Sequence, residues 1–325
     1  MEYTRLGSSG LKISRITLGC MSFGEPGRGS GWALDDDAAE PIFRQALDLG
    51  ITFWDTANVY NGGSSEEIVG RALRKHTDRD RIVLATKVFF PVHDGPGGSG
   101  LSRKAIMENI DASLRRLGTD YVDLYQIHRF DPETPVEETM EALHDVVRAG
   151  KARYLGASSM WAWQFAKLQH AADLGGWTRF VSMQNQYSLL QREEEREMFG
   201  LLADQGVGSL PWSPLAKGRL ARPWEDMSTR RAGSDPLQAR YAHEENRPIV
   251  DAVRRVAEAR GVPMAQIALA WVLRNPVVDA PIVGPTNARH LSDAVAALEI
   301  ELTGAEVAAL EEHYTPRLPS GYDGR

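Results

Sequence analysis

The stretch VDLYQIHRFDPETPVEETMEALHDVVRAGKARYLGA, residues 122–157, contains one complete unit of the pattern that runs through this chain. It starts with an apolar run, Val122–Ile127, passes through a polar loop into an amphipathic segment, Pro135–Ala149, and ends with a second apolar run, Ala152–Ala157. Nearly continuous apolar runs are typical of strands that are buried on both faces. Gly150, directly after the amphipathic segment, is a typical helix stop. The stretch therefore predicts two parallel strands joined by a right-handed helical crossover.

The same pattern recurs between Ser14 and Leu298. We expect eight strands, at Arg15–Leu18, Thr52–Asp55, Val83–Thr86, Val122–Ile127, Ala152–Ala157, Phe180–Gln184, Gly208–Pro211 and Asp279–Val283. We expect helices between and after them, at Asp37–Leu49, Ser65–Leu73, Ser102–Leu117, Pro135–Ala149, Met160–Leu174, Glu193–Gln205, Pro248–Arg260 and Asn287–Leu298. Doubly wound sheets typically have five or six strands, whereas eight such units match a closed barrel. The sequence therefore predicts an α/β fold, a (β/α)8 TIM barrel.

Segments outside the repeat predict additions to this barrel. Met1–Leu6 and Leu11–Ile16, joined by a Gly-Ser-Ser-Gly turn, predict an N-terminal β-hairpin. Val262–Arg274 and Gly304–Tyr314 predict extra C-terminal helices. Because no linker rich in Pro, Gly or Ser divides the chain, we expect residues 1–325 to form a single (β/α)8 barrel domain.

Composition excludes several classes of protein. Hydrophobic residues make up 42% and charged residues 25% of the 325 residues, which excludes disordered and collagen-like chains. The net charge of −7 argues against a nucleic-acid partner. The longest apolar stretch, around Pro263–Leu273, is too short to span a membrane. The polar start of the chain is unlike a signal peptide, and Cys20 is the only cysteine, so we expect a reducing, cytoplasmic location. The sequence carries no indication of the oligomeric state.

Four titratable residues fall at the carboxyl ends of neighbouring strands, where barrels place their chemistry. Asp55 follows the second strand with Tyr60 five residues later, Lys87 ends the third strand, and His128 ends the fourth. A buried Lys87 ammonium requires a partner, which Asp55 would supply. The remaining positive field would lower the pKa of Tyr60, which would then protonate a developing alkoxide while His128 holds its oxygen.

Each of these residues alone also has an ordinary structural interpretation. Asp55 would cap a turn, Tyr60 would pack with its hydroxyl in water, and His128 would be a satisfied core histidine. Together they would supply a proton and a hydrogen bond to a carbonyl oxygen that gains negative charge. The set includes neither a nucleophile nor a metal site, and the eight histidines of the chain show no His-x-His pair.

The other strand ends favour a cofactor. Trp212 offers a flat face on which an aromatic ring can stack. Gln184 and Asn185 can hydrogen-bond a carboxamide as donor and acceptor together. Gly284 and Thr286 begin the helix after the last strand, and a helix N-terminus suits a phosphate group. Most cations of the long loop after the seventh strand are interpreted as solvated; they are Lys217, Arg219, Arg222, Arg230 and Arg231.

Asp55, Tyr60, Lys87 and His128 together resemble the catalytic tetrad of the aldo-keto reductase superfamily. Surrounding strings are similar as well: Leu18-Gly19-Cys20-Met21, Asp55-Thr56-Ala57-Asn58-Val59-Tyr60, Gly156-Ala157-Ser158-Ser159, Gln184-Asn185-Gln186-Tyr187 and Trp212-Ser213-Pro214-Leu215. The last string looks closer to the aryl-alcohol dehydrogenase and potassium-channel β-subunit branch than to the aldose reductases. The resemblance implies an eight-fold barrel, NADPH bound across its top, and reversible reduction of aldehydes or ketones.

The resemblance also implies roles. Tyr60 would be the general acid, tuned by Lys87 and Asp55, and His128 would orient the carbonyl of a small-molecule substrate. NADPH or NADP would contact Gly19, Cys20, Met21, Asp55, Ser158, Ser159, Gln184, Trp212, Ser213, Pro214, Leu215, Lys217, Gly284, Thr286, Arg289, His290 and Asp293. The chain departs from the family pattern at Ala294, where the usual Asn would contact adenine.

Residues in the loops after the strands indicate the chemical class of the substrate. Phe23, Trp32 and Phe89 indicate an apolar or aromatic carbonyl compound, whereas Arg129, beside His128, would favour an anionic one. Three other functions are alternatives to carbonyl reduction. A metal-dependent barrel hydrolase would need clustered His ligands, and only His128 lies at a strand end. A doubly wound dinucleotide enzyme would need Gly-x-Gly-x-x-Gly after the first strand, and the glycines there have the wrong spacing. An NADPH-binding regulatory or redox-sensing subunit with weak reductase activity remains the alternative.

Overall fold

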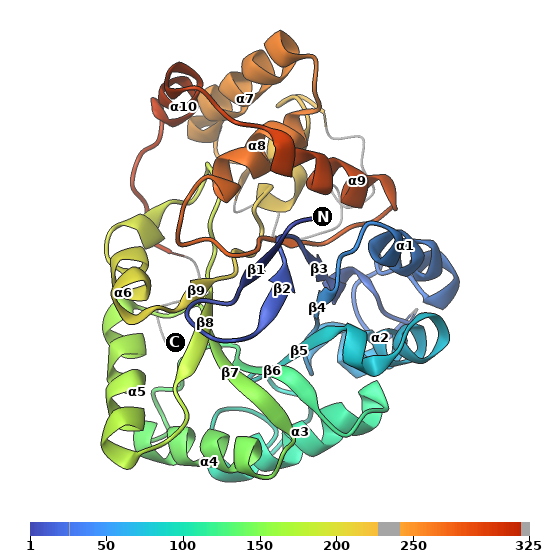
Figure 1. Cartoon of the computed structure of the whole chain (residues 1–325), viewed down its shortest axis with the longest axis vertical. Coiled ribbons are helices and arrows are strands. Elements are labelled where there is room, and N and C mark those ends of the chain that lie inside the picture. The colour runs from blue at the N-terminus through green and yellow to red at the C-terminus, as the bar shows by residue number, and fades with distance from the viewer. Residues whose placement is uncertain (26, 227–240, 320–325) are drawn as a thin grey trace.

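Eight parallel strands form the centre of the computed structural model, which describes residues 1–25, 27–226 and 241–319 (Figure 1). The strands are β3 (Thr17–Gly19), β4 (Phe53–Asp55), β5 (Val83–Val88), β6 (Val122–Ile127), β7 (Ala152–Ser158), β8 (Phe180–Gln184), β9 (Gly208–Ser209) and β10 (Ile282–Val283). They are paired in the order β10-β3-β4-β5-β6-β7-β8-β9. Parallel bridges from Ser209 to Val278 and from Trp212 to Ile282 join the two ends of this row. The predicted barrel and all eight of its strands are confirmed.

The last two strands are shorter than expected. The sequence predicted strands over Gly208–Pro211 and Asp279–Val283, but β9 and β10 contain two residues each. Pro211 and Pro281 have no backbone N–H, so each interrupts the ladder. Their carbonyl groups still accept hydrogen bonds, Pro211 from Ile282 and Pro281 from Thr17, so the barrel wall continues past both residues.

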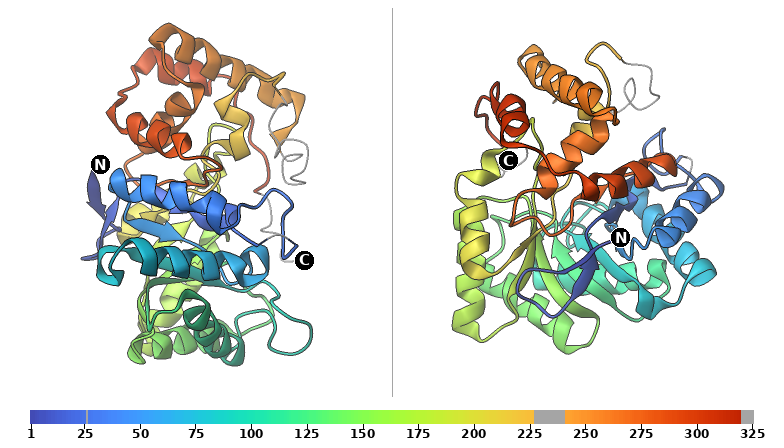
Figure 2. Two further views of the ribbon diagram at one scale, coloured as in Figure 1. Left: turned by 90° about the vertical axis from the view of Figure 1, so that its right-hand side faces the viewer. Right: turned by 45° about the horizontal axis from the view of Figure 1, so that its top comes forward.

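Helices surround the barrel (Figure 1). Those that follow individual strands are α1 (Asp36–Asp48), α2 (Ser64–His76), α3 (Arg103–Leu117), α4 (Val136–Arg148), α5 (Ala162–Gly175), α6 (Met198–Gln205) and α9 (Arg289–Ala296). The others, α7 (Arg247–Arg260), α8 (Met264–Leu273) and α10 (Gly304–Glu311), gather on one side (Figure 2). The two extra C-terminal helices predicted from the sequence, α8 and α10, are thus confirmed. Among the described residues, no helix has both the length and the apolar character that a membrane span requires.

One predicted helix is divided. Instead of a continuous helix over Glu193–Gln205, a 3₁₀ turn covers Glu193–Glu195 and α6 begins at Met198. The side chain of Glu194 is buried and accepts a hydrogen bond from Asn185 Nδ2 at 2.8 Å. This contact ties the turn to the end of β8 and separates it from the helix. Arg230 and Arg231, interpreted above as loop cations, lie outside the described residues.

The N-terminal hairpin closes one end of the barrel. Its strands β1 (Tyr3–Arg5) and β2 (Lys12–Ser14) pair antiparallel, as predicted. The fully buried side chains of Leu6 and Ile13 pack against a cluster from the barrel wall, which contains Phe53, Ala85, Leu124, Leu210, Ala280 and Ile282. A ligand can therefore enter the barrel only from its other end, where the carboxyl ends of the strands lie.

A half-buried carboxyl group attaches this hairpin to the barrel. Asp279 Oδ2 accepts a hydrogen bond from Gly7 N at 2.7 Å. Burial raises the pKa of Asp279 to about 6, although the Gly7 N–H and the nearby Arg15 act in the opposite direction. The folded chain therefore binds a proton here more tightly than the unfolded chain does.

We expect this group to make stability depend on pH. A carboxyl group with a raised pKa contributes most to stability at low pH, and the contribution is lost as pH rises from about 4 to about 6. Asp279→Asn removes the titration but keeps an acceptor for Gly7. Relative to wild type, the variant should gain up to about 3 kcal/mol between pH 3.5 and pH 7 in urea unfolding. Parallel stability curves for the two proteins would contradict the assignment.

Candidate active site

A cavity of about 620 Å³ opens at the carboxyl ends of the strands. Most of the site residues expected from the sequence line it: Gly19, Cys20, Met21, Asp55, Tyr60, His128, Arg129, Ser158, Gln184, Trp212, Ser213, Pro214, Leu215, Lys217, Gly284, Thr286, His290 and Asp293. Residues far apart in the sequence therefore meet at one end of the barrel.

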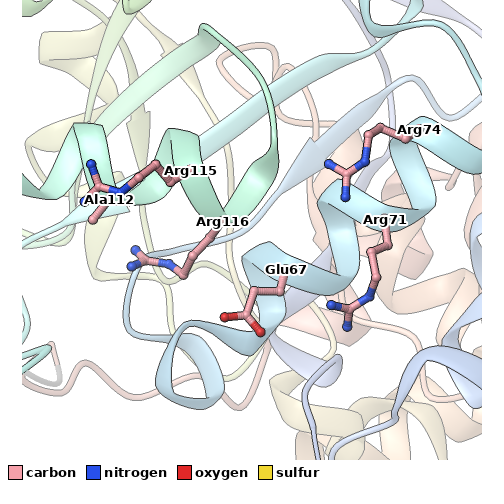
Figure 3. Close-up of a pocket in the computed structure, with 6 residues that line it drawn as sticks. All are labelled: Glu67, Arg71, Arg74, Ala112, Arg115 and Arg116. Carbon is pink, nitrogen blue, oxygen red and sulfur yellow. The ribbon is translucent and has the colours of Figure 1, made fainter.

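A second hollow lies on the outside of the barrel, between α2 and α3 (Figure 3). Its lining is rich in arginine and consists of Glu67, Arg71, Arg74, Ala112, Arg115 and Arg116. Arg71 already pairs with Asp36 at 2.6 Å and Arg116 with the buried Glu66 at 2.6 Å. Because two of its four arginines are paired with carboxylates, and because the hollow contains none of the expected residues, the cavity at the strand ends is the candidate active site.

An ion pair lies beneath this cavity. Lys87 in β5 is fully buried, and its Nζ donates to Asp55 Oδ2 at 2.5 Å and to the carbonyl oxygen of Thr56 at 2.8 Å. The same ammonium is 3.3 Å from the hydroxyl of Tyr60. Asp55 ends β4, and Tyr60 begins a 3₁₀ turn, Tyr60–Gly63, that returns the chain towards the barrel. The predicted contact between Asp55, Lys87 and Tyr60 is present.

The pKa of Tyr60 differs from the expectation. Burial raises it above the usual value for a phenol, and the Lys87 ammonium offsets only part of that shift. The prediction of a lowered pKa was wrong because desolvation of the hydroxyl outweighs the attraction of Lys87. For Lys87, burial acts to lower the pKa, but Asp55 and Tyr60 raise it overall. At neutral pH the site therefore contains a protonated phenol next to a charged ammonium.

His128 directly follows β6 and lines the cavity. Burial, with Lys87 and Arg129 nearby, holds its pKa well below the usual range, so the imidazole is neutral. Its Nδ1 has no hydrogen-bond partner among the described residues. The ring lies edge-on to Tyr60, with centroids 5.7 Å apart, and to Phe90 at 4.8 Å. A neutral imidazole in this place can donate its N–H to a ligand oxygen.

Gln126 was not among the site residues expected from the sequence. Its Nε2 donates to Asp55 Oδ1 at 2.9 Å, and its Oε1 accepts from Gln184 Nε2 at 3.1 Å. Gln184 Nε2 also donates to Asp55 Oδ1, at 3.1 Å. One signal was present in the sequence: Gln126 lies near the end of β6, two residues before His128, and side chains two residues apart in an extended chain point to the same face.

On the opposite side of the cavity, the indole of Trp212 is held in place. Its Nε1 donates to Ser159 Oγ at 2.9 Å. Ser159 is buried and does not line the cavity, and Ser158 Oγ donates to the carbonyl oxygen of Gln184 at 2.9 Å. Asn185, expected to bind a carboxamide beside Gln184, is fully buried and donates instead to Glu194. It does not reach the cavity, because successive residues point to opposite faces of the barrel wall.

The far end of the cavity contains cations and a helix start. Arg222, interpreted from the sequence as solvated, lines the cavity, and its Nε and Nη2 are buried with no hydrogen-bond partner among the described residues. Burial lowers its pKa. Arg219 is buried too, with its guanidinium 3.7 Å from the ring centroid of Trp224. Arg289, at the start of α9, is 82% exposed and does not line the cavity. An anion in the cavity would satisfy Arg222.

The residues expected around the substrate divide into two groups. Arg129 lines the cavity, and so does Phe90, the residue after Phe89. Phe23, Trp32 and Phe89 do not line it. Phe23 instead belongs to the core, where its ring centroid is 4.8 Å from that of Phe43. Across residues 1–25, 27–226 and 241–319, no cluster of three or more His, Cys, Asp or Glu side chains could hold a metal ion.

Known proteins are similar to this chain over nearly its whole length. The sequence model of the Aldo/keto reductase family matches residues 15–315. Versiconal hemiacetal acetate reductase of Aspergillus parasiticus is 47% identical, and the match covers 98% of each chain. Aldo-keto reductase AMT2 of Alternaria alternata is 45% identical over 98% of this chain and 93% of its own. The putative aryl-alcohol dehydrogenase AAD16 of Saccharomyces cerevisiae is 42% identical over 98% of each chain.

Proposed function

This chain belongs to the aldo/keto reductase family and is an oxidoreductase, and we propose that it reduces an aldehyde or ketone to the alcohol with NADPH. The observation that carries the proposal is the Lys87 ammonium, which contacts both Asp55 and Tyr60 at the base of a cavity next to a neutral His128. A carbonyl oxygen that becomes an alkoxide needs a proton and a hydrogen-bond donor. These residues supply both.

Tyr60 is the proposed general acid. NADPH, when bound, supplies the hydride. Tyr60 gives its proton to the developing alkoxide, and the Lys87 ammonium, 3.3 Å away, stabilises the phenolate that remains. Asp55 keeps Lys87 charged inside the barrel, and the neutral His128 donates a hydrogen bond to the carbonyl oxygen. Each of these groups either lines the cavity or contacts a group that lines it.

Other residues of the cavity are proposed to hold the cofactor. Gln184 would accept a hydrogen bond from the nicotinamide carboxamide, and Trp212, fixed by Ser159, would stack on the nicotinamide ring. Ser158, Ser213, Leu215 and Lys217 would lie along the nicotinamide half and the pyrophosphate. The unpartnered guanidinium atoms of Arg222 support a phosphate position there. Arg289, exposed beside the start of α9, would bind the 2′-phosphate of NADPH.

We propose an aromatic or apolar carbonyl compound as the substrate. Phe90 lines the cavity and packs edge-on against His128, next to the proposed position of the reacting oxygen. Several relatives are named as aryl-alcohol dehydrogenases, which supports an aromatic substrate. A cytoplasmic location is part of the same proposal, because the one cysteine is a buried, unpaired thiol that suits a reducing compartment.

Removing the proposed acid should abolish turnover but not cofactor binding. We expect Tyr60→Phe to lower kcat about 10²- to 10⁴-fold, the usual contribution of general acid catalysis. The dissociation constant for NADPH, measured by fluorescence titration, should change less than about twofold, since the ring remains. Tyr125→Phe is the matched control, because Tyr125 is buried away from the cavity and donates only to the Ile106 carbonyl oxygen. Near wild-type turnover by Tyr60→Phe would refute the assignment.

The two arginines should affect the coenzymes differently. Arg289→Ala is expected to weaken NADPH binding about tenfold and to leave NADH binding unchanged, because only NADPH has the 2′-phosphate. Arg222→Gln should weaken both coenzymes by similar factors, because it faces a phosphate that they share. Titrations of each variant with both coenzymes measure these effects, and Arg148→Ala, on an exposed turn of α4, controls for charge loss. Equal losses of NADPH and NADH in Arg289→Ala would remove the 2′-phosphate assignment.

A turnover screen with NADPH tests the substrate class. Aromatic aldehydes and ketones should give higher kcat/KM values than sugars or short aliphatic aldehydes. Phe90→Ala should reduce that preference about tenfold, because an aromatic pair contributes roughly 1 kcal/mol or more. A preference for sugars would exclude an aromatic substrate. No turnover with any carbonyl class, combined with tight NADPH binding, would favour the regulatory subunit instead.

A further inference from the structure

Three buried polar side chains form a single layer across the barrel interior. Asp55, Gln126 and Gln184 come from β4, β6 and β8, which are alternate strands, and alternate strands fill the layers of an eight-stranded barrel. Between the latter two, β7 contributes Gly156, which is paired in register with Gln126. A Cβ at Gly156 would lie 3.0 Å from Gln126 Cγ and 2.6 Å from Ser182 Oγ. The glycine therefore leaves the space that the Gln126 side chain occupies.

The chemistry of these groups fixes the direction of every hydrogen bond in the layer. The Asp55 carboxylate pairs with the Lys87 ammonium and accepts hydrogen bonds, so Gln126 must present its NH₂ group to it. The Gln126 carbonyl oxygen then faces Gln184, which must also present its NH₂ group. The second hydrogen of that group is directed to Asp55 Oδ1. Reversal of either amide would place two donors or two acceptors face to face.

This order has a consequence for the cavity, which Gln184 lines. Because both hydrogens of its NH₂ group are engaged, Gln184 can offer a ligand only its carbonyl oxygen. We propose that Gln126 is a positioning residue that fixes Gln184 as a pure hydrogen-bond acceptor, so that the site selects a ligand group with an N–H. Under the proposed function, on which this inference rests, that group is the carboxamide of the nicotinamide. Without Gln126, only Asp55 Oδ1 holds the Gln184 amide in this orientation, and one of its two N–H groups is released.

Cofactor analogues test the proposal by binding alone. NADP⁺ has a carboxamide, whereas its 3-acetylpyridine analogue has a methyl ketone and so no N–H at this position. Wild type should bind NADP⁺ about tenfold more tightly than the analogue, the effect of one hydrogen bond. Gln126→Met, which is similar in size but cannot hydrogen-bond, should lower this ratio about threefold, because only Asp55 then holds the Gln184 amide in place.

A matched control separates this effect from a general loss of stability. Gln169 on α5 is a buried glutamine whose amide bonds both the N–H and the carbonyl oxygen of Phe180, away from the cavity. Gln169→Met should lower the melting temperature and leave the binding ratio unchanged. If Gln126→Met does not fold, Gln126→Asn replaces it, because the shorter amide cannot span Asp55 and Gln184 together, and the same loss of discrimination is expected.

The outcomes also separate this inference from the proposed function. A wild-type protein that binds NADP⁺ but does not discriminate against the analogue would overturn the inference alone. So would a Gln126→Met or Gln126→Asn variant with the wild-type ratio. A wild-type protein that binds neither dinucleotide would overturn the proposed function, and the inference with it.

Discussion

The contact between Lys87 and Asp55 is the interaction on which the candidate site depends. A charged ammonium with no exposure to water is costly unless a carboxylate and further acceptors surround it. Asp55 and the Thr56 carbonyl oxygen satisfy Lys87, and two glutamine amides satisfy the remaining oxygen of Asp55. Because these groups come from four different strands, the curved wall of the barrel is what brings all of the partners to the pair. The fold thus makes the Lys87–Asp55 pair possible, and the proposed proton transfer from Tyr60 depends on that pair.

The ion pair of Lys87 and Asp55 has no net charge. At a distance the charges of Lys87 and Asp55 cancel, so this pair adds little net field to the cavity. At short range the ammonium still faces the Tyr60 hydroxyl, and His128 remains uncharged because burial and the nearby cations disfavour its protonation. These residues can therefore favour negative charge on an oxygen that lies next to Tyr60 and His128.

Much of the fold and of the site was predictable, because the relevant signals are local in the sequence. Apolar runs such as Val122–Ile127 and helix stops such as Gly150 depend on a few neighbouring residues, and strand ends then indicate where Asp55, Lys87 and His128 must meet. Burial is different, since it depends on the whole structure. The rise in the Tyr60 pKa, the inward orientation of Arg222 and the burial of Phe23 all follow from packing between distant segments. Gln126 escaped notice because its partners, Asp55 and Gln184, are 71 and 58 residues away.

The hairpin that closes the barrel joins the beginning of the chain to residues made much later. Leu6 and Ile13 pack against Ala280 and Ile282, and the hydrogen bond from Gly7 to Asp279 spans 272 residues. Contacts this distant raise the contact order and slow folding. During synthesis, Leu6 and Ile13 leave the ribosome long before Ala280 and Ile282, so they lack these partners until almost the whole barrel has emerged. The N-terminal segment is therefore the part of this chain that most needs protection from aggregation before folding is complete.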